Sequence, residues 1–284
     1  MRIRASLAAA TVSGAVALTA LVAPAAQAAD SPQVPKAFLS KPATPSTGRM
    51  TPADETDGDV TITKVTDNSN KDVVVGTGQK TFNIYVTASD PSGIYTADAI
   101  LWHGTDIDND VDGVLASENE ATCDNWSATS ATCKITITAT PGTDLYDSAL
   151  NGKWNVAVYA VANDGDYIEK DVYKNRWVKR AASFSGFNAS PEPVAKGKTI
   201  TVAGTLNRAS WTYLKYYGYG SQSVELQFKP ATGSTYSTVK TIKSSSTGYL
   251  KTTVTASVDG TWRFHYAGNS TSSVADAYDA VDVR

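Results

Sequence analysis

Four aspartates stand on alternate positions of one short stretch, residues 106–112, and Gly113 follows directly. Ionised carboxylates at this spacing repel one another unless a cation gathers them. Ca²⁺ prefers hard oxygen ligands from a short loop, and glycine lets such a loop turn sharply beneath the ion. The pattern predicts a Ca²⁺ site whose ligands are Asp106, Asp108, Asp110, Asp112 and Glu118.

An EF-hand is the first form of calcium site to compare with this run. Asp108, Asp110 and Asp112 fit loop positions 1, 3 and 5, but position 12 is Asn119, where a bidentate glutamate is expected. The flanking segments do not have the pattern of helices. A calcium-binding loop of a β-sandwich fits better, and a solvated acidic loop whose aspartates shape turns is the alternative.

No residue pattern for catalysis accompanies the acidic run. His103 and His265 are the only histidines, no Gly-x-Ser-x-Gly elbow occurs, and no phosphate-binding loop or dinucleotide motif is present. Dispersed carboxylates could still form the site of an extracellular hydrolase, which stays open as an alternative. The sequence favours a protein that is not an enzyme.

Residues 1–28 have the pattern of a secretory signal. Arg2 and Arg4 precede an apolar stretch, and Ala26-Gln27-Ala28 matches a cleavage site. Cleavage there removes two positive charges and takes the formal net charge from −3 to −5. We expect a secreted, extracellular protein with no further membrane span, and association with the cell wall is compatible with this. An acidic chain of this kind is poorly suited to nucleic acid.

Cys123 and Cys133 are the only cysteines. In an exported protein, two cysteines are expected to form a disulfide. A pair can also bind a metal, but no further ligands of the right kind stand nearby in the sequence.

The chain divides into three further segments. Residues 29–57 are rich in proline, serine and threonine and predict a disordered linker. After it, short runs rich in threonine, valine, isoleucine and tyrosine alternate with turn residues, which indicates an all-β protein. Trp154 and Trp262 stand in similar contexts 108 positions apart, a domain-sized repeat. These patterns predict two tandem β-sandwiches or barrels, residues 58–182 and 183–284, with each tryptophan in a core.

A second unusual stretch lies between two predicted strands of the second half. It crowds five aromatic residues into a short segment: Trp211, Tyr213, Tyr216, Tyr217 and Tyr219. Exposed rings of this kind stack on sugars or fill protein interfaces. Packing of two or three rings beneath a loop is the simpler interpretation, and we favour it.

Several segments resemble bacterial immunoglobulin-like domains. They are Ala88–Ile94, Lys153–Gly165, Asn188–Val202 and Gly248–Trp262. The chain after the signal is also similar to small secreted actinomycete proteins labelled calcium-binding, most clearly at Leu101–Thr105 and Gly248–Gly268. This resemblance implies an immunoglobulin-like fold and a calcium-binding or structural role outside the cell. A carbohydrate- or wall-binding module that uses the 211–219 aromatics is the main alternative function.

Overall fold

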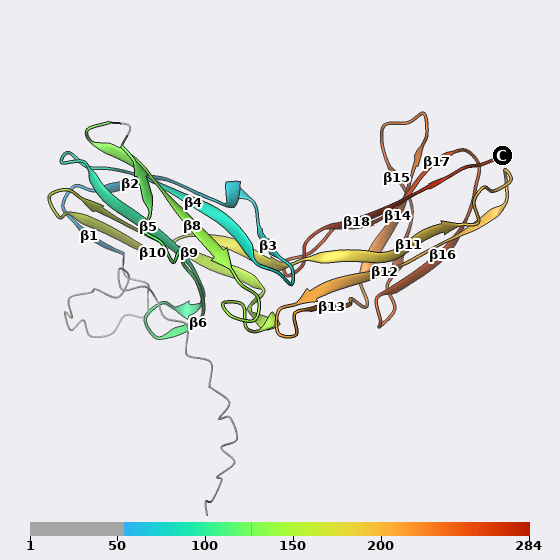
Figure 1. Ribbon diagram of the computed structural model, residues 1–284, viewed down its shortest axis with the longest axis horizontal. Helices are drawn as coiled ribbons and strands as arrows, with labels where there is room; N and C mark the ends of the chain where they lie inside the picture. The colour runs from blue at the N-terminus through green and yellow to red at the C-terminus, as the bar shows by residue number, and fades with distance from the viewer. Residues whose placement is uncertain (1–53, 126) are drawn as a thin grey trace, which may run out of the picture. The chain divides into compact units, whose positions relative to one another are not determined.

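The computed structural model describes residues 54–125 and 127–284 (Figure 1). The predicted signal and residues 29–53 of the predicted linker lie outside this range. Within it, the secondary structure is strand apart from two single 3₁₀ turns, η2 (Asn68–Asn70) and η3 (Ser148–Leu150). None of the described residues belongs to a helix long and apolar enough to cross a membrane.

The first sandwich consists of two sheets that are antiparallel except for one pair of strands. Its strands are β1 (Glu55–Asp57), β2 (Thr61–Asp67), β3 (Val73–Val75), β4 (Lys80–Ser89), β5 (Ile94–Asp106), β6 (Asp110–Leu115), β7 (Thr122–Asp124), β8 (Ser130–Ala139), β9 (Gly152–Ala162) and β10 (Tyr167–Arg180). One sheet has the order β2-β4-β8-β7, and the other has the order β1-β10-β9-β5-β6, with β3 parallel to β10. Strand β1 occupies the last three residues of the segment predicted to be a linker.

Strict alternation of side chains explains why these segments are strands. In β4 and β8, every second residue is buried, whereas threonines on the outer face pair across the strands, as Thr81 does with Thr138 at 2.9 Å. A period of two places one face of each strand in the core. The core between the two sheets includes Ile84, Ile135 and Trp154.

The second sandwich repeats this design with fewer strands. They are β11 (Ala182–Ser190), β12 (Thr199–Ser210), β13 (Lys215–Gly218), β14 (Ser223–Pro230), β15 (Ser237–Lys243), β16 (Tyr249–Thr255), β17 (Gly260–Tyr266) and β18 (Ala275–Val281). In one sheet β12 pairs with β11, β13 and β16, and the other sheet has the order β15-β14-β17-β18. Its core gathers around Trp262 and Phe264.

The strand order in both sandwiches is that of immunoglobulin-like domains. In the first, β2, β4, β8 and β7 correspond to strands A, B, E and D of an immunoglobulin sheet, and β5, β9 and β10 to strands C, F and G of its partner. In the second sandwich, β11, β12 and β16 face β14, β17 and β18 in the same way. The prediction of an all-β protein of two tandem immunoglobulin-like sandwiches is confirmed.

Some strands had no clear sequence signal. Residues 110–112 were expected to lie in a loop but begin β6, and Lys215–Gly218 was expected to be loop but forms β13. Both are edge strands that pair with one neighbour, β5 or β12. These two segments therefore adopt strand conformation because they pair with a neighbouring strand, and not because of a full alternating pattern of their own.

Candidate metal centre

The predicted calcium-binding run forms the tip of the β5–β6 hairpin. Asp106 ends β5 and pairs with Asp110, the first residue of β6. The run is therefore a tight turn between paired strands and not an open ligand loop. Strands on both sides also exclude the helix–loop–helix of an EF-hand.

Hydrogen bonds inside the hairpin account for three of its four aspartates. Asp106 accepts from the backbone N of Asp108 at 2.9 Å and of Asn109 at 3.2 Å, and these bonds, with that of the Asn109 side chain, hold the pKa of Asp106 below its usual range. Asp110 accepts from the Thr105 hydroxyl, and Asp112 lies 2.5 Å from His103 Nδ1. Each of these three carboxylates thus stabilises the turn or a cross-strand contact.

Apolar packing also anchors this hairpin. Ile107, in the middle of the acidic run, is only 7% exposed and packs in a cluster with Trp102, Ile100 and Ala157. Ile100 and Trp102 point to the face of β5 opposite Leu101, which belongs to the main core. Burial of these side chains stabilises the position of the turn.

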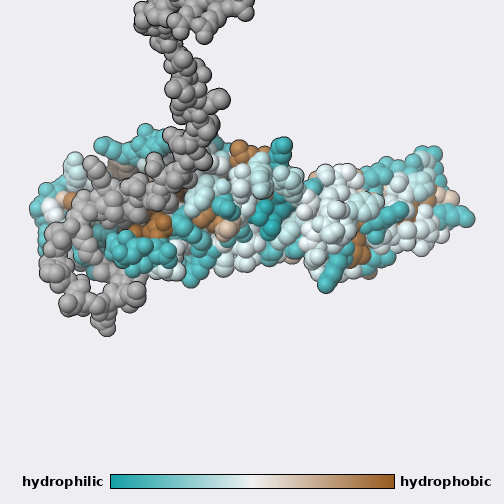
Figure 2. Space-filling view, turned by 90° about the horizontal axis from the view of Figure 1, so that it is seen from below, coloured by the Kyte–Doolittle hydropathy of each residue, from teal (hydrophilic) through white to brown (hydrophobic). Residues whose placement is uncertain are grey.

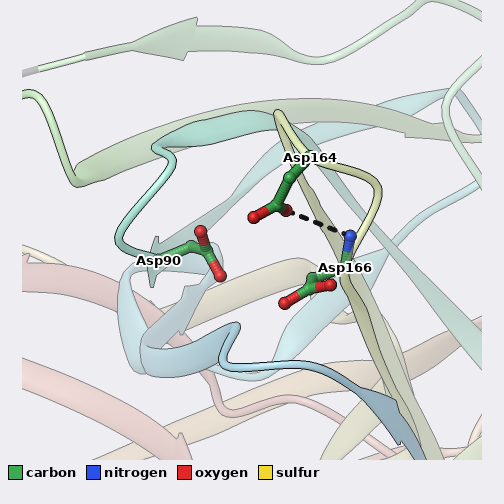
Figure 3. A group of neighbouring side chains, drawn as sticks. All are labelled: Asp90, Asp164 and Asp166. Atoms are coloured by element: carbon green, nitrogen blue, oxygen red, sulfur yellow. Dashed lines mark hydrogen bonds between the residues drawn. The ribbon is translucent and has the colours of Figure 1, made fainter.

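The five predicted ligands do not come together in the described part of the chain. Within it, one group of three carboxylates has ligand atoms all within 4.8 Å of one another, and that group is Asp90, Asp164 and Asp166 (Figure 3). We call it the acidic triad. Calcium binding by Asp106, Asp108, Asp110, Asp112 and Glu118 stays a prediction, and the acidic triad is the candidate metal centre.

Two turns build the acidic triad. Asp90 follows β4 and opens an Asp-Pro-Ser-Gly turn that leads into β5, closed by a bond from Gly93 N to Asp90 O at 3.0 Å. Proline at the second position and glycine at the fourth are typical of a type I turn. The turn lies close to the backbone of Ala128: a Cβ at Gly93 would lie only 2.7 Å from Ala128 O.

Asp164 and Asp166 come from the turn between β9 and β10. The Asp164 carboxylate accepts from Asp166 N at 3.3 Å, and Asp164 N in turn donates to the Ser92 hydroxyl at 3.3 Å. The Ser92 hydroxyl also donates to Asp90 Oδ1 at 2.7 Å. Ser92 therefore ties the two turns together and sets the spacing of the carboxylates.

The segment between β1 and β2 reaches the same place. Asp59 N donates to Asp166 Oδ2 at 2.9 Å. Gly58 has φ +78°, and a Cβ there would lie 1.6 Å from that same carboxylate oxygen. The positive φ and this close approach favour glycine at position 58, so three separate segments of the first sandwich meet at the acidic triad, in which Asp90 is buried, Asp166 half-buried and Asp164 exposed.

One oxygen of the acidic triad lacks a partner. Asp90 is 3% exposed, its Oδ1 accepts from Ser92 N and Oγ, and its Oδ2 is buried with no hydrogen-bond partner. In Figure 3 the Asp90 carboxylate points toward Asp164 and Asp166. A buried carboxylate oxygen without a partner is costly, and a cation would satisfy it. None of the ion pairs formed by the described residues involves the acidic triad.

The spacing of the acidic triad suits Ca²⁺. Oxygens bind Ca²⁺ at about 2.3–2.6 Å, so two ligands on opposite sides of one ion lie about 5 Å apart. Three carboxylates supply at most part of its coordination shell, and backbone carbonyls or water complete such sites. The residues present therefore fit a divalent cation bound by oxygen.

The strand order carries a sequence signal for this centre. Asp90 and the Asp164–Asp166 turn each look like ordinary turn chemistry when taken alone. However, the B–C and F–G loops of an immunoglobulin-like sandwich cluster at one end. Once β4, β5, β9 and β10 are assigned to strands B, C, F and G, the two acidic turns are expected to meet.

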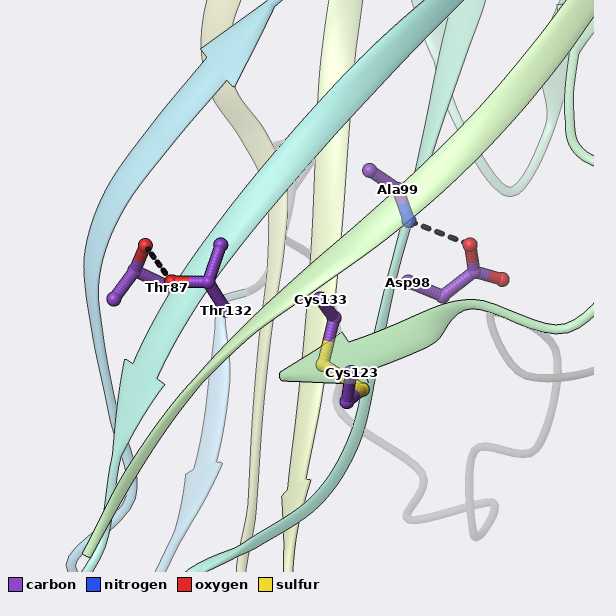
Figure 4. Close-up of a disulfide and its surroundings, with 6 residues drawn as sticks. All are labelled: Thr87, Asp98, Ala99, Cys123, Thr132 and Cys133. Carbon is purple, nitrogen blue, oxygen red and sulfur yellow. Dashed lines mark hydrogen bonds between the residues drawn. A yellow bond between two sulfur atoms is a disulfide. The ribbon is translucent and has the colours of Figure 1, made fainter. Parts of the chain in front are cut away.

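The predicted disulfide is present and lies within one sheet. Cys123 of β7 and Cys133 of β8 are directly paired across the strands and are bonded to each other (Figure 4). It ties the three-residue edge strand β7 to β8, whereas the disulfide of antibody domains joins two sheets.

The aromatic stretch divides between core and surface. Trp211 is fully buried with the apolar core of the first sandwich and donates through Nε1 to Val75 O at 3.1 Å. Tyr219 is half-buried and packs edge-on against Tyr266. Three tyrosines are exposed, Tyr213 at 68%, Tyr216 at 43% and Tyr217 at 49%.

Where described atoms are visible in Figure 2, the surface offers no broad apolar area. Hydrophilic residues cover most of the described atoms there, and apolar residues appear as separate small patches. Single exposed apolar side chains are normal on a monomer surface.

Comparisons with known proteins give no family for this chain. No protein-family model matches the chain, and no curated protein matches it at a significant level. Fibronectin(III)-like modules of CbhA from Clostridium thermocellum are 18% identical, with a TM-score of 0.30 over 78% of this chain and 93% of that chain. The D0-D1 domain of intimin is 16% identical, with a TM-score of 0.24 over 76% of this chain and 97% of that chain.

A third similar structure is dimeric latent PorU from Porphyromonas gingivalis. It is 12% identical, with a TM-score of 0.27 over 79% of this chain and 20% of that chain, so the chain spans about a fifth of PorU. The pairing of its own strands defines this chain as an all-β protein of two immunoglobulin-like sandwiches.

Proposed function

We propose that this chain is a secreted, non-enzymatic module stabilised by calcium, in which the two immunoglobulin-like domains, β1–β10 and β11–β18, serve a binding or structural role outside the cell. The acidic triad is the proposed Ca²⁺ site. The observation that carries the proposal is the Asp90 carboxylate, which points toward two further carboxylates and whose buried Oδ2 has no hydrogen-bond partner.

The proposed role of the ion is to hold one end of the first sandwich together. The proposed ligands of the ion come from the β4–β5 and β9–β10 turns. A third segment joins them, because Asp59 N donates a hydrogen bond to the Asp166 carboxylate. An ion that binds only the folded state stabilises it by mass action, by about 1.4 kcal/mol at ten times its dissociation constant. Mg²⁺ should stabilise less, because it gives up its waters reluctantly.

Direct measurement of bound calcium tests the proposal. We expect isothermal titration of metal-free protein to show one Ca²⁺ per chain, and Asp164→Asn to weaken that binding because it removes a ligand charge. Asp110→Asn is the matched control, since it changes the same charge in the β5–β6 hairpin. Loss of binding in Asp110→Asn with retention in Asp164→Asn would move the site to the acidic run. No binding by the parent protein would reject a calcium site altogether.

A further inference from the structure

Two arginines lie close together where β10 leads into β11. Arg180 is the last residue of β10, and Arg208 belongs to β12. Both bind the same short segment between β17 and β18, because Arg180 N donates to Thr271 O at 3.1 Å and Arg208 Nη1 donates to Ser272 Oγ at 3.2 Å. We call Arg180 and Arg208 the arginine pair. Neither residue belongs to the acidic triad.

Contacts with the second sandwich hold both guanidinium groups in place. Arg180 Nε donates to Ala209 O, and the guanidinium carbon of Arg208 lies 4.0 Å from the centre of the Tyr219 ring. These hydrogen bonds use one nitrogen of each side chain, whereas a guanidinium carries five N–H donors. Both arginines are half-buried, so their remaining donors have a fixed position and are still reached from solvent.

The arginine pair has no carboxylate partner in the described part of the chain. None of the ion pairs formed within residues 54–125 and 127–284 includes Arg180 or Arg208. Arg176 of the same strand β10, by contrast, binds the buried Asp67. Charges withdrawn from water are usually paired, and two like charges near each other without a counter-charge are unfavourable. An anion bound between the two guanidinium groups would relieve both costs.

Two ionisable groups indicate a positive potential at this place. Burial, and then the charge of Arg208, lower the pKa of Arg180 to about 10, and weaker opposite effects of Tyr219 and Asp147 do not offset them. Burial raises the pKa of Tyr219, but hydrogen bonds from Ser272 and Asn269 and the charge of Arg208 outweigh it and hold that pKa below its usual range. A cation is thus disfavoured here and an anion is favoured.

The groups beside the arginine pair are suited to an oxygen-rich anion. Asn269 is exposed, and its Nδ2 donates to the Tyr219 hydroxyl at 3.0 Å, which leaves the amide a second N–H. The planar fork of a guanidinium matches two oxygens of a phosphate or a carboxylate. Two unpaired guanidinium charges balance a dianion better than a single carboxylate. Charge therefore favours a phosphate group as the ligand.

We propose that the arginine pair binds a phosphate group, with Arg180 and Arg208 donating to its oxygens and Asn269 at the solvent side of the site. The contacts that fix the two side chains are formed before the ligand arrives, which lowers the cost of ordering them on binding. The phosphate group belongs either to free phosphate or to a phosphate ester, and both present the same oxygens to the guanidinium groups. This site does not require calcium at the acidic triad.

Isothermal titration of the whole protein with small anions tests this proposal. The probes are inorganic phosphate, methyl phosphate and acetate, in calcium-free buffer at matched ionic strength. We expect inorganic phosphate to bind at least about tenfold more tightly than acetate, because it carries more charge and more oxygens. Methyl phosphate that binds as tightly as inorganic phosphate would identify an ester as the source, and weaker binding of methyl phosphate would identify free phosphate. Both of these results support the site.

Variants of the protein locate the binding site. Arg208→Gln and Arg180→Gln should each raise the dissociation constant of phosphate by about tenfold. Lys251→Gln, an equal change of charge at an exposed position of β16, should leave binding unaltered. Melting without phosphate shows whether each variant is folded, and Arg180→Gln alone decides if Arg208→Gln is not. Equal affinities for phosphate and acetate, no binding of phosphate, or an equal loss in Lys251→Gln would each overturn the proposal.

Discussion

Trp154 and Trp262 occupy the same position in their respective sandwiches. Each is the third residue of its strand, β9 or β17, after a glycine at the first position, and each strand is central in a sheet. Both indoles are buried, with 0% and 5% exposure. The predicted repeat of 108 residues is therefore a repeat of structure, with one core tryptophan in each sandwich.

Truncation of either tryptophan should destabilise its own sandwich. Trp154→Ala and Trp262→Ala remove a large buried ring, and we expect each to lower the free energy of unfolding by about 3–5 kcal/mol. Chemical denaturation followed by circular dichroism measures the loss. Tyr85→Ala, at a 40% exposed strand position, is the control and should cost much less. A loss of under 1 kcal/mol in either tryptophan variant would contradict its assignment to a core.

Alternation of buried and exposed residues made most of the strands predictable from the sequence. Two kinds of feature could not be predicted in this way. Strand β13 is exposed at all four positions, so no apolar face distinguished it from a loop. The acidic triad joins turns 74 positions apart, Asp90 and Asp164, and only strand order brings them together. The Asp106–Asp112 run was conspicuous because its residues are adjacent, but adjacent residues of a hairpin need not converge on one point.

A buried ion pair should make the first sandwich sensitive to acid. Asp67, at the end of β2, is fully buried and binds Arg176 and Lys174 of β10, so it connects the two sheets. Burial by itself raises the pKa of Asp67, but hydrogen bonds and charge from Arg176 and Lys174 outweigh it and hold the pKa below its usual range. The stabilisation is present above the unfolded-state pKa and is lost as the pH falls through the lower folded-state pKa.

We therefore expect stability to decline below about pH 4, the unfolded-state value for aspartate. Asp67→Asn should cost about 3–5 kcal/mol at pH 7, because it leaves two cations without their partner, and should flatten the acid dependence. Asp72→Asn, which breaks the more exposed pair with Lys179, should cost far less. Unfolding curves across pH 2–7 that coincide in shape for the parent and Asp67→Asn would contradict this role.

The disulfide should contribute to the stability of the first sandwich. Reduction of Cys123–Cys133, or the double change Cys123→Ala and Cys133→Ala, should lower the free energy of unfolding by about 2–3 kcal/mol, because nine residues lie between the cysteines and the enclosed loop is short. Free-thiol titration of the denatured, unreduced protein should find no thiol. Two titrating thiols per chain would show that the bond does not form.

The aromatic stretch should matter for stability at Trp211 and not for sugar binding. Trp211→Ala should lower the melting temperature, since its indole is fully buried. Tyr216→Ala and Tyr217→Ala should alter neither the melting temperature nor retention on insoluble polysaccharide. The rings of Tyr213 and Tyr217 meet edge-to-face and offer no flat stacking platform together. If the parent is retained and either tyrosine variant is not, the exposed tyrosines form a glycan site.

The calcium dependence of melting for one variant tests the central proposal most directly. Asp90→Asn keeps the size of the side chain and replaces the charged carboxylate, whose Oδ2 has no partner, by an amide of similar shape. In 10 mM CaCl₂, compared with EDTA at matched ionic strength, we expect the first sandwich of the parent protein to melt at a higher temperature. Asp90→Asn should show no such shift, and its melting temperature in EDTA should be at least as high as that of the parent. An equal calcium shift in the parent and Asp90→Asn, or no shift in the parent, would contradict calcium binding at the acidic triad.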